Sequence, residues 1–291
     1  KNLNIFFMLF TIHHAASSGG SIISQAIAAA TNSILISEIN PYGEIRDHRI
    51  KPHYDPTSML WHLSYNSIEL NNLNKLKYFL YQLEIAFDHA EKIKKNILLR
   101  DHTHTTFNFL GEKYAYFTKD SNSLFLEAVN FYYEKLNSKL KPKKYRPILS
   151  LRHPLDSFIS ARNSQWLKAY CGSKIDLDNY CKGLIKLFNY MNYKESAVVM
   201  RYEDFCENLE KSLEGLFCEI KTKYKIPSIE EINSIKVTGK SGRISNEIRL
   251  PPRNFDLIGM DLIEQINNSK YYPELCKLNN YNPNFKEHPL F

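Results

Sequence analysis

The sequence predicts an α/β fold, a single domain in which helices cover both faces of a parallel sheet. Short, β-rich apolar runs alternate with segments of helical period, and polar turns follow several of the runs. With 291 residues, 43% of them hydrophobic and 13% aromatic, the chain can fill one large core. Because parallel strands end at one edge of their sheet, we expect the polar turns and the ligand site to gather there.

The predicted strands are short apolar runs closed by polar residues or proline. They cover residues 6–12, 33–39, 96–100, 146–152 and 197–202. The predicted helices have apolar residues at three- and four-residue spacing. They cover residues from 22 onward, 66–95, 124–140, from 154 onward, 178–193, 204–223 and 256–267. Residues 41–65 contain three prolines and are predicted as a lid or binding loop, and residues 270–291 as an aromatic C-terminal tail.

The first strand leads into a Gly/Ser-rich turn, His14–Ser21, and a helix follows from Ile22. A strand, a glycine turn and a helix N-terminus together attract an anion, because backbone N–H groups and the helix dipole point at it. Ser17, Ser18 and Ser21 add hydroxyl donors. The turn lacks a Gly-Lys-Ser/Thr ending, so it is not the ATP/GTP phosphate loop. A purely structural turn is the alternative.

A second candidate anion site follows the fourth predicted strand. Arg152 ends that strand, and Pro154 opens the next helix, on which Ser157 and Ser160 share a face. A guanidinium and a hydroxyl that converge on one point suit a phosphate monoester. In the alternative interpretation, Arg152 pairs with Asp156 and the serines only cover the helix surface.

Composition and charge narrow the classes of function. The net charge of +7 comes from scattered Lys and Arg, which favours an anionic small ligand over nucleic acid. The five cysteines show neither CxxC pairs nor metal spacing, so reduced thiols and a cytoplasmic location are expected. No apolar run reaches transmembrane length. The segment Leu3–Ile12 also fits the apolar part of a signal peptide, but it runs straight into the turn, which favours a central strand.

Several motifs, in the expected order over roughly residues 5–250, resemble the PAPS-dependent sulfotransferase family. His14–Ser21 resembles the loop that holds the 5′-phosphosulfate. Leu151–Ser160 resembles the 3′-phosphate motif R-x-P-x-D-x-x-x-S, with its Arg-to-Ser spacing kept. Ser37–Pro41 resembles the second-strand segment of bacterial members. Met200–Phe205 resembles the RYEDL strand end, whose aromatic residue tends to lie near the adenine.

A late basic loop completes the resemblance. Gly239–Arg243 resembles the loop that closes over the 3′-phosphate, although in isolation it also fits a solvated basic loop. The resemblance implies transfer of a sulfuryl group from PAPS to an acceptor, with PAP as the product. The implied acceptor is a glycan, a lipid or a small alcohol. The implied nucleotide-binding residues are Ser17, Ser18, Gly19, Gly20, Ser21, Arg152, Ser160, Tyr202, Lys240, Ser241, Gly242 and Arg243.

The resemblance also implies the catalytic residues. Arg100-Asp101-His102 aligns by pattern with the Lys-Thr-His turn that carries the family's catalytic histidine. We assign His102 as the general base and Arg100 as a residue that stabilises charge, with His104 as the rival base. His102-x-His104 also fits half of a metal site, but no further ligand stands at convincing spacing, so no metal is expected.

The phosphate turn departs from the family at one position. Ser17 stands where the family usually has a lysine, and a neutral hydroxyl cannot neutralise the leaving oxygen. Another cation such as Arg100 or Lys240 can take that role, turnover can be slow, or the domain can bind the nucleotide without efficient chemistry. Two alternative functions follow, a nucleotide or small-molecule phosphotransferase and a non-catalytic PAP-binding module.

Overall fold

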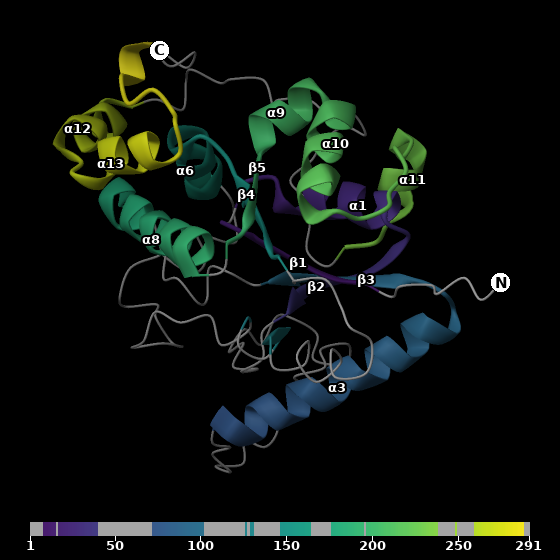
Figure 1. Cartoon of the computed structure of the whole chain (residues 1–291). Coiled ribbons are helices and arrows are strands. Elements are labelled where there is room, and N and C mark those ends of the chain that lie inside the picture. The colour runs from purple at the N-terminus through teal and green to yellow at the C-terminus, as the bar shows by residue number, and fades with distance from the viewer. Residues whose placement is uncertain are drawn as a thin grey trace.

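A computed structural model gives the architecture of the chain (Figure 1). The structure describes residues 8–15, 17–39, 72–101, 126, 129–130, 146–163, 176–194, 196–237, 248 and 259–287. Within these residues helices flank a parallel sheet, which confirms the predicted fold class. The predicted lid at 41–65, the loop at 238–243 and most of the predicted helix at 124–140 lie outside the described residues.

In the described part of the chain, the sheet has five parallel strands in the order β2-β3-β1-β4-β5. Their bounds are β1 Leu9–His14, β2 Ser33–Ile39, β3 Asn96–Asp101, β4 Ile148–Leu151 and β5 Val198–Arg201. From β1 the chain moves out to β2 and back to β3, and it then crosses to β4 and β5. The connections after β1 and β4 therefore run in opposite directions. The edge above these two strands is the topological switch point, where open α/β sheets bind ligands.

Helices bury both faces of the sheet, and its central strands are accordingly apolar. On β3, Leu98 belongs to the core on one face and Leu99 to the core on the other. The same alternation sends Arg100 to the face of Leu98 and Asp101 to the face of Leu99. The side chains of these two neighbouring charged residues at the end of β3 therefore lie on opposite faces of the sheet.

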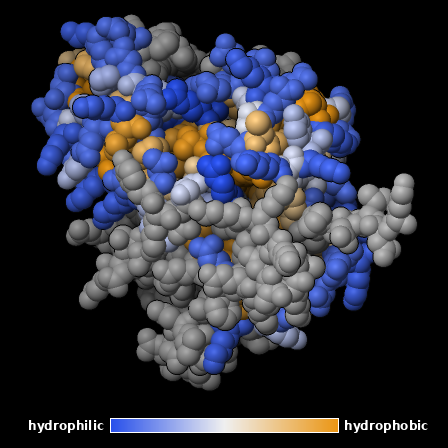
Figure 2. All heavy atoms as spheres, in the orientation of Figure 1, coloured by the Kyte–Doolittle hydropathy of each residue, from blue (hydrophilic) through white to orange (hydrophobic). Residues whose placement is uncertain are grey.

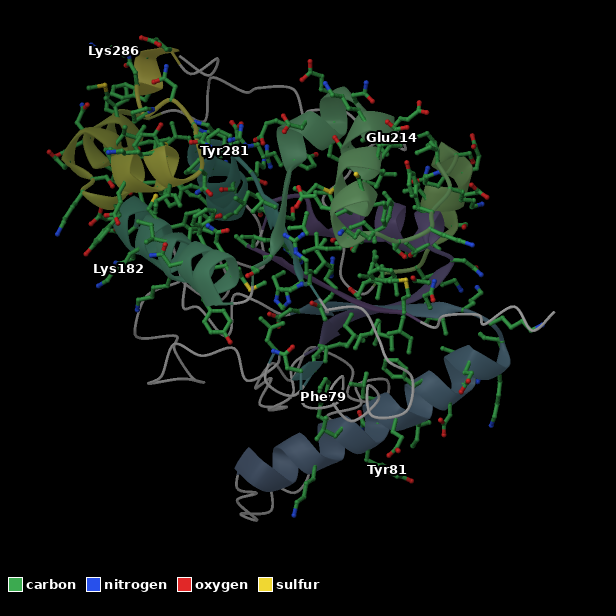
Figure 3. All side chains as sticks on the ribbon, viewed as in Figure 1. Phe79, Tyr81, Lys182, Glu214, Tyr281 and Lys286 are labelled. Atoms are coloured by element: carbon green, nitrogen blue, oxygen red, sulfur yellow. The ribbon has the colours of Figure 1, made fainter. Side chains whose placement is uncertain are left out.

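The helices divide between the two cores. The core that contains Leu99 is covered by α3 Asn72–Lys92, α6 Pro154–Asn163, α8 Leu177–Asn189, α12 Met260–Asn268 and α13 Tyr271–Leu278. The core that contains Leu98 is covered by α1 Gly20–Ala30, α9 Tyr202–Glu207, α10 Leu209–Ile220 and α11 Ile229–Ser234. In Figure 3, Phe79 points from α3 toward the sheet and is buried, whereas Tyr81 points away and is 62% exposed. A π-helix, Tyr190–Lys194, extends α8, and a 3-10 helix, Phe285–Glu287, lies near the C-terminus.

The predicted helix over 204–223 is in fact two helices. The first, α9, begins at Tyr202, which the sequence pattern assigned to the preceding strand, and it ends at Glu207. Asn208 then leaves the helical conformation, with φ −148° and ψ 93°, and its side chain accepts the N–H of Lys211 at 2.9 Å. Asparagine is a favoured N-cap, so the break between α9 and α10 has a local cause.

The described part of the C-terminal third contains two helices that the sequence pattern did not predict. The short helix α11 begins with a capping box, in which Ser228 and Glu231 satisfy each other's backbone N–H groups. The helix α13 lies in the segment 270–291 that was predicted as a tail, and its Tyr272 is 1% exposed. The C-terminal segment is therefore part of the core.

The described surface is mostly hydrophilic in the view of Figure 2, with a hydrophobic patch near the middle of the upper half. On the edge strand β5, Val199 is 39% exposed. Among the described residues, every helix is too short or too polar to cross a lipid bilayer.

Candidate functional site

The turn after β1 bends sharply into α1. Ser17 (φ 65°) and Gly19 (φ 80°) both have left-handed backbone conformations, which glycine adopts easily and serine rarely. Ser18 closes the inside of the turn, because its N–H and its hydroxyl both donate to the carbonyl oxygen of Ala15, at 3.3 and 2.8 Å. The helix α1 then begins at Gly20.

Neither glycine of this turn has room for a side chain. A Cβ atom on Gly19 would lie 2.1 Å from the ring of Tyr202, and one on Gly20 would lie 2.2 Å from the ring of His14. Two aromatic rings therefore pack directly on the turn, one from β1 and one from α9. Alanine at either position would force a ring or the backbone to move.

The helix dipole places partial positive charge at the start of α1. Its first turn contains no acidic residue, and its N-cap, Gly19, contributes no side-chain hydrogen bond. The guanidinium of Arg100 adds a full charge, because its Nη1 atom donates to the hydroxyl oxygen of Ser21. Arg100 is only 1% exposed. The structure thus brings a buried arginine to the turn that contains Ser17.

Arg152 reaches the same turn from the end of β4. Its Nη1 atom donates to the carbonyl oxygen of Ser17 at 3.0 Å, and its guanidinium lies 5.1 Å from the centre of the Tyr202 ring. Below it, the Ser150 hydroxyl donates to the carbonyl oxygen of Ser18 at 3.3 Å. The Nε atom of Arg152 is buried and has no hydrogen-bond partner among the described residues. An unused donor atom on a partly buried guanidinium is what an arginine that binds an anion would offer.

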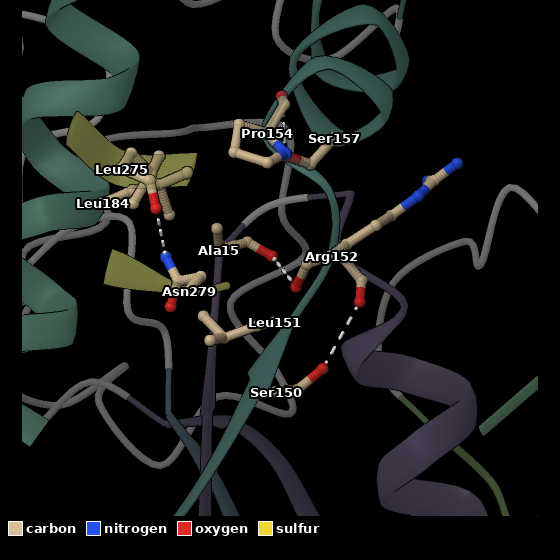
Figure 4. Close-up of a pocket in the computed structure, with 10 residues that line it drawn as sticks. Ala15, Ser150, Leu151, Arg152, Pro154, Ser157, Leu184, Leu275 and Asn279 are labelled. Carbon is tan, nitrogen blue, oxygen red and sulfur yellow. Dashed lines mark hydrogen bonds between the residues drawn. The ribbon is translucent and has the colours of Figure 1, made fainter. Parts of the chain in front are cut away.

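The small cavity in Figure 4 lies behind this turn and is not the anion site. Its lining consists of Ala15, Ser18, Ser150, Leu151, Arg152, Pro154, Ser157, Leu184, Leu275 and Asn279. Its volume is about 10 Å³, at the lower limit for a single water molecule. The Arg152 side chain points away from the cavity (Figure 4). The guanidinium is therefore directed to the opposite side of the chain, toward the turn and Tyr202.

Tyr202 is the ring that joins the two candidate anion sites, since it packs on Gly19 and faces Arg152. Burial raises the pKa of its phenol well above the ordinary 10.0, and the neighbouring Cys206 raises the pKa further, while Arg152 acts against both. The phenol is therefore neutral at physiological pH. It contributes a π face and a hydroxyl group, but no negative charge that would oppose an anion.

Ser160 is half-buried on the second turn of α6, the helix that follows Arg152. No hydrogen bond joins Ser160 to Arg152 within the described part of the chain. The hydroxyl of Ser157, by contrast, donates to the carbonyl oxygen of Pro154 at 3.1 Å and serves the helix itself. Of the two serines predicted on this face, only Ser160 is available to a ligand.

A buried polar chain lies on the other face of the sheet. The Nδ1 atom of His13 lies 2.8 Å from Oδ2 of Asp101, and its Nε2 atom lies 3.0 Å from Oγ1 of Thr11. These contacts resemble a hydroxyl–His–Asp triad, but the exposed fractions of Thr11, His13 and Asp101 are 0%, 0% and 2%. The three side chains are buried, and their contacts tie β1 to the end of β3.

The remaining predicted site residues fall outside the described part of the chain. These are His102, His104, Lys240, Ser241, Gly242 and Arg243. Asp101 is the last described residue of β3, at the same edge of the sheet as the turn after β1.

Sequence reasoning missed two residues that shape this site, Glu203 and Tyr281. The Glu203 carboxylate accepts the N–H of His153 at 2.8 Å and the hydroxyl of Tyr281 at 3.0 Å. Glu203 is part of the RYEDL-like motif, but the sequence indicated no role for its carboxylate. No sequence signal links Tyr281 to the site, because it is 78 positions away from Glu203.

Comparison with known proteins adds no relative, since no family model, curated protein or solved structure matches this chain.

Proposed function

We propose that the protein is a PAPS-dependent sulfotransferase, which transfers a sulfuryl group from PAPS to an acceptor hydroxyl. The observation that carries this proposal is the hydrogen bond between Arg152 and Ser17. It brings the motif that we assign to the 3′-phosphate next to the turn that we assign to the 5′-phosphosulfate. In this proposal the turn Ser17–Ser21 binds the 5′-phosphosulfate through its N–H groups and hydroxyls. Arg152, with Ser160, binds the 3′-phosphate.

The charge balance of the reaction supports a role for Arg100. As the bond between sulfur and the 5′-phosphate oxygen breaks, the electron pair stays on that oxygen, and PAP leaves with an additional negative charge. A buried guanidinium at Ser21 stabilises such charge strongly, because the low dielectric around it does little to screen the attraction. Arg100 therefore takes the part of the lysine that Ser17 replaces.

The acceptor needs a base, and His102 is our candidate. The acceptor oxygen gives its proton to the imidazole as it forms the new bond to sulfur, and the sulfuryl group leaves PAP in the same step. His102 directly follows Asp101, whose carboxylate is fixed by His13. His104 is the rival, two positions further along the chain.

A nucleotide-binding comparison followed by a transfer assay tests the proposal. We expect PAP to raise the melting temperature, and ATP with Mg²⁺ to leave it unchanged. Labelled PAPS should then transfer its sulfuryl group to at least one member of a panel of glycans, lipids and small alcohols. Stabilisation by ATP with Mg²⁺ but not by PAP would instead indicate a phosphotransferase.

One observation also supports a non-catalytic PAP-binding module as a second candidate. Ser17 provides no cation at the position where the sulfotransferase family that the motifs resemble usually has its lysine. Such a module would bind PAP with normal affinity and transfer no label to any acceptor. The same two measurements therefore separate all three functions.

A further inference from the structure

The first turn of α9 holds both the backbone and the side chain of the arginine that we assign to the 3′-phosphate. The Tyr202 ring supports the guanidinium of Arg152. The next residue, Glu203, accepts the N–H of His153, which directly follows Arg152, at 2.8 Å. Two consecutive residues of one helix thus fix the end of β4 at two different points.

Glu203 is itself held from the C-terminal segment. The hydroxyl of Tyr281 donates to the second oxygen of its carboxylate at 3.0 Å. Burial and the neighbouring Glu203 raise the pKa of that phenol well above the ordinary 10.0, so Tyr281 remains a hydrogen-bond donor up to high pH. Both oxygens of Glu203 therefore have a fixed partner, and the carboxylate has little freedom to rotate.

The Tyr281 ring makes two more contacts in the same place. It lies edge-on to the ring of His153, with the ring centres 4.9 Å apart, and the guanidinium of Arg201 lies 4.9 Å from its centre. Arg201 also donates to the carbonyl oxygen of Asn279. In Figure 3, Tyr281 lies where the C-terminal helices approach α9. The loop after α13 is thus joined to the ends of β4 and β5 by one aromatic residue.

We propose that Glu203 and Tyr281 are positioning residues of the anion site, through which the C-terminal segment sets the position of Arg152. Neither residue needs to touch the ligand. The carboxylate fixes the backbone at His153, and the guanidinium of Arg152 can then reach the carbonyl oxygen of Ser17. This inference rests on the proposed function only in its choice of PAP as the ligand to be measured.

Three variants in the full chain test the proposal by PAP titration. Glu203→Ala removes both hydrogen bonds, and we expect PAP binding to weaken about 10-fold, the effect of one charged hydrogen bond. Glu203→Gln keeps an acceptor for the His153 N–H and should bind within about 3-fold of the wild type. Tyr281→Phe keeps the ring and removes only the hydroxyl, and we expect a loss of about 2- to 5-fold.

A control variant separates positioning from general destabilisation. Leu262→Ala, on the buried face of α12, should lower the melting temperature at least as much as Glu203→Ala and leave PAP affinity unchanged. Equal PAP affinity in the wild type and Glu203→Ala overturns the proposal, and so does equal weakening by Glu203→Ala and Glu203→Gln. If Glu203→Ala does not fold, Tyr281→Phe decides, and wild-type affinity there overturns the role of the C-terminal segment.

Hydrogen exchange of the His153 amide, measured without ligand, tests the positioning role of Glu203 independently of PAP binding. If the wild type does not bind PAP, the proposed function fails, but the His153 amide can still be followed. We expect its exchange to accelerate about 10-fold in Glu203→Ala and to stay near the wild-type rate in Glu203→Gln. Unchanged exchange of the His153 amide in Glu203→Ala overturns the positioning role whatever the ligand is.

Discussion

The Nη1 atom of Arg152 lies 3.0 Å from the carbonyl oxygen of Ser17, although the two residues are 135 positions apart in the chain. The parallel pairing of β1 with β4 brings them together, because His14 and Ser150 are register partners at the ends of these strands. The contact joins the turn after β1 to the turn after β4 at the switch point of the sheet. The candidate anion site therefore depends on the strand order.

Replacement of Arg152 should weaken PAP binding. We expect Arg152→Ala to cost about 1.5–3 kcal/mol of binding free energy, the range for a hydrogen bond to a charged group. Isothermal titration with PAP measures the loss. Arg162→Ala is a matched control, because Arg162 lies at the end of α6, the helix that follows Arg152, and pairs there with Asp261 of α12. This variant should bind PAP normally. Unchanged affinity in Arg152→Ala would remove Arg152 from the site.

Replacement of the proposed base should affect the chemical step and not nucleotide binding. We expect His102→Ala to reduce sulfuryl transfer about 10²- to 10⁴-fold and to bind PAP almost normally, the usual effect of losing a general base. Transfer from labelled PAPS and a PAP titration measure the two quantities. His104→Ala is the paired variant. A large loss of transfer in His104→Ala alone would assign the base to His104.

Replacement of the buried cation should lower kcat more than PAP affinity. We expect Arg100→Gln to reduce kcat about 10²- to 10³-fold, the effect of losing one preorganised donor at developing charge. Arg100→Lys keeps the charge and should retain more activity. Arg146, which is partly exposed and pairs with Glu219, provides the control, and we expect Arg146→Ala to have a normal kcat. An Arg100→Gln variant with wild-type kcat would contradict the assignment.

The tight packing on the turn between β1 and α1 should make Gly20 intolerant of alanine. We expect Gly20→Ala to lower the free energy of unfolding by about 1–3 kcal/mol, because its Cβ would collide with the ring of His14. The double variant His14→Ala/Gly20→Ala should recover part of that loss. Gly215→Ala is the control, since a Cβ there meets nothing within 4 Å, and it should stabilise α10 by about 0.5–1 kcal/mol. Chemical denaturation measures all three, and an unaffected Gly20→Ala would contradict the packing described for the turn.

The C-terminal core should lose stability in alkaline solution. Burial raises the pKa of Cys276 from 9.0 to about 11. The folded chain therefore holds this proton more tightly than the unfolded chain, and the contribution to stability is complete below pH 9.0 and is lost as pH rises toward about 11. We expect the melting temperature to fall over this interval, and to fall less in Cys276→Ala. Parallel pH profiles for the wild type and Cys276→Ala would show that the thiol is not responsible.

Local patterns determined much of the fold. The apolar runs before His14 and after Asn96 formed strands, because parallel strands buried on both faces consist of nearly continuous apolar residues. The pattern failed at α9 and α10, where one capping residue, Asn208, divides a single amphipathic stretch. It failed again at α13, because that helix is short and depends on contacts of Tyr272 with the core.

The sequence alone determined the fold class, the Gly/Ser turn before α1 and the presence of Arg152 at the end of a strand, since each depends on residues that are neighbours in the chain. Only the tertiary structure decided that Arg152 meets Ser17, that Arg100 reaches Ser21, and that Tyr281 holds Glu203. These contacts join distant segments, and their geometry follows from strand order and from the alternation of side chains across the sheet. A one-residue shift of β3 would move Arg100 to the opposite face, and no local pattern in the sequence specifies that register.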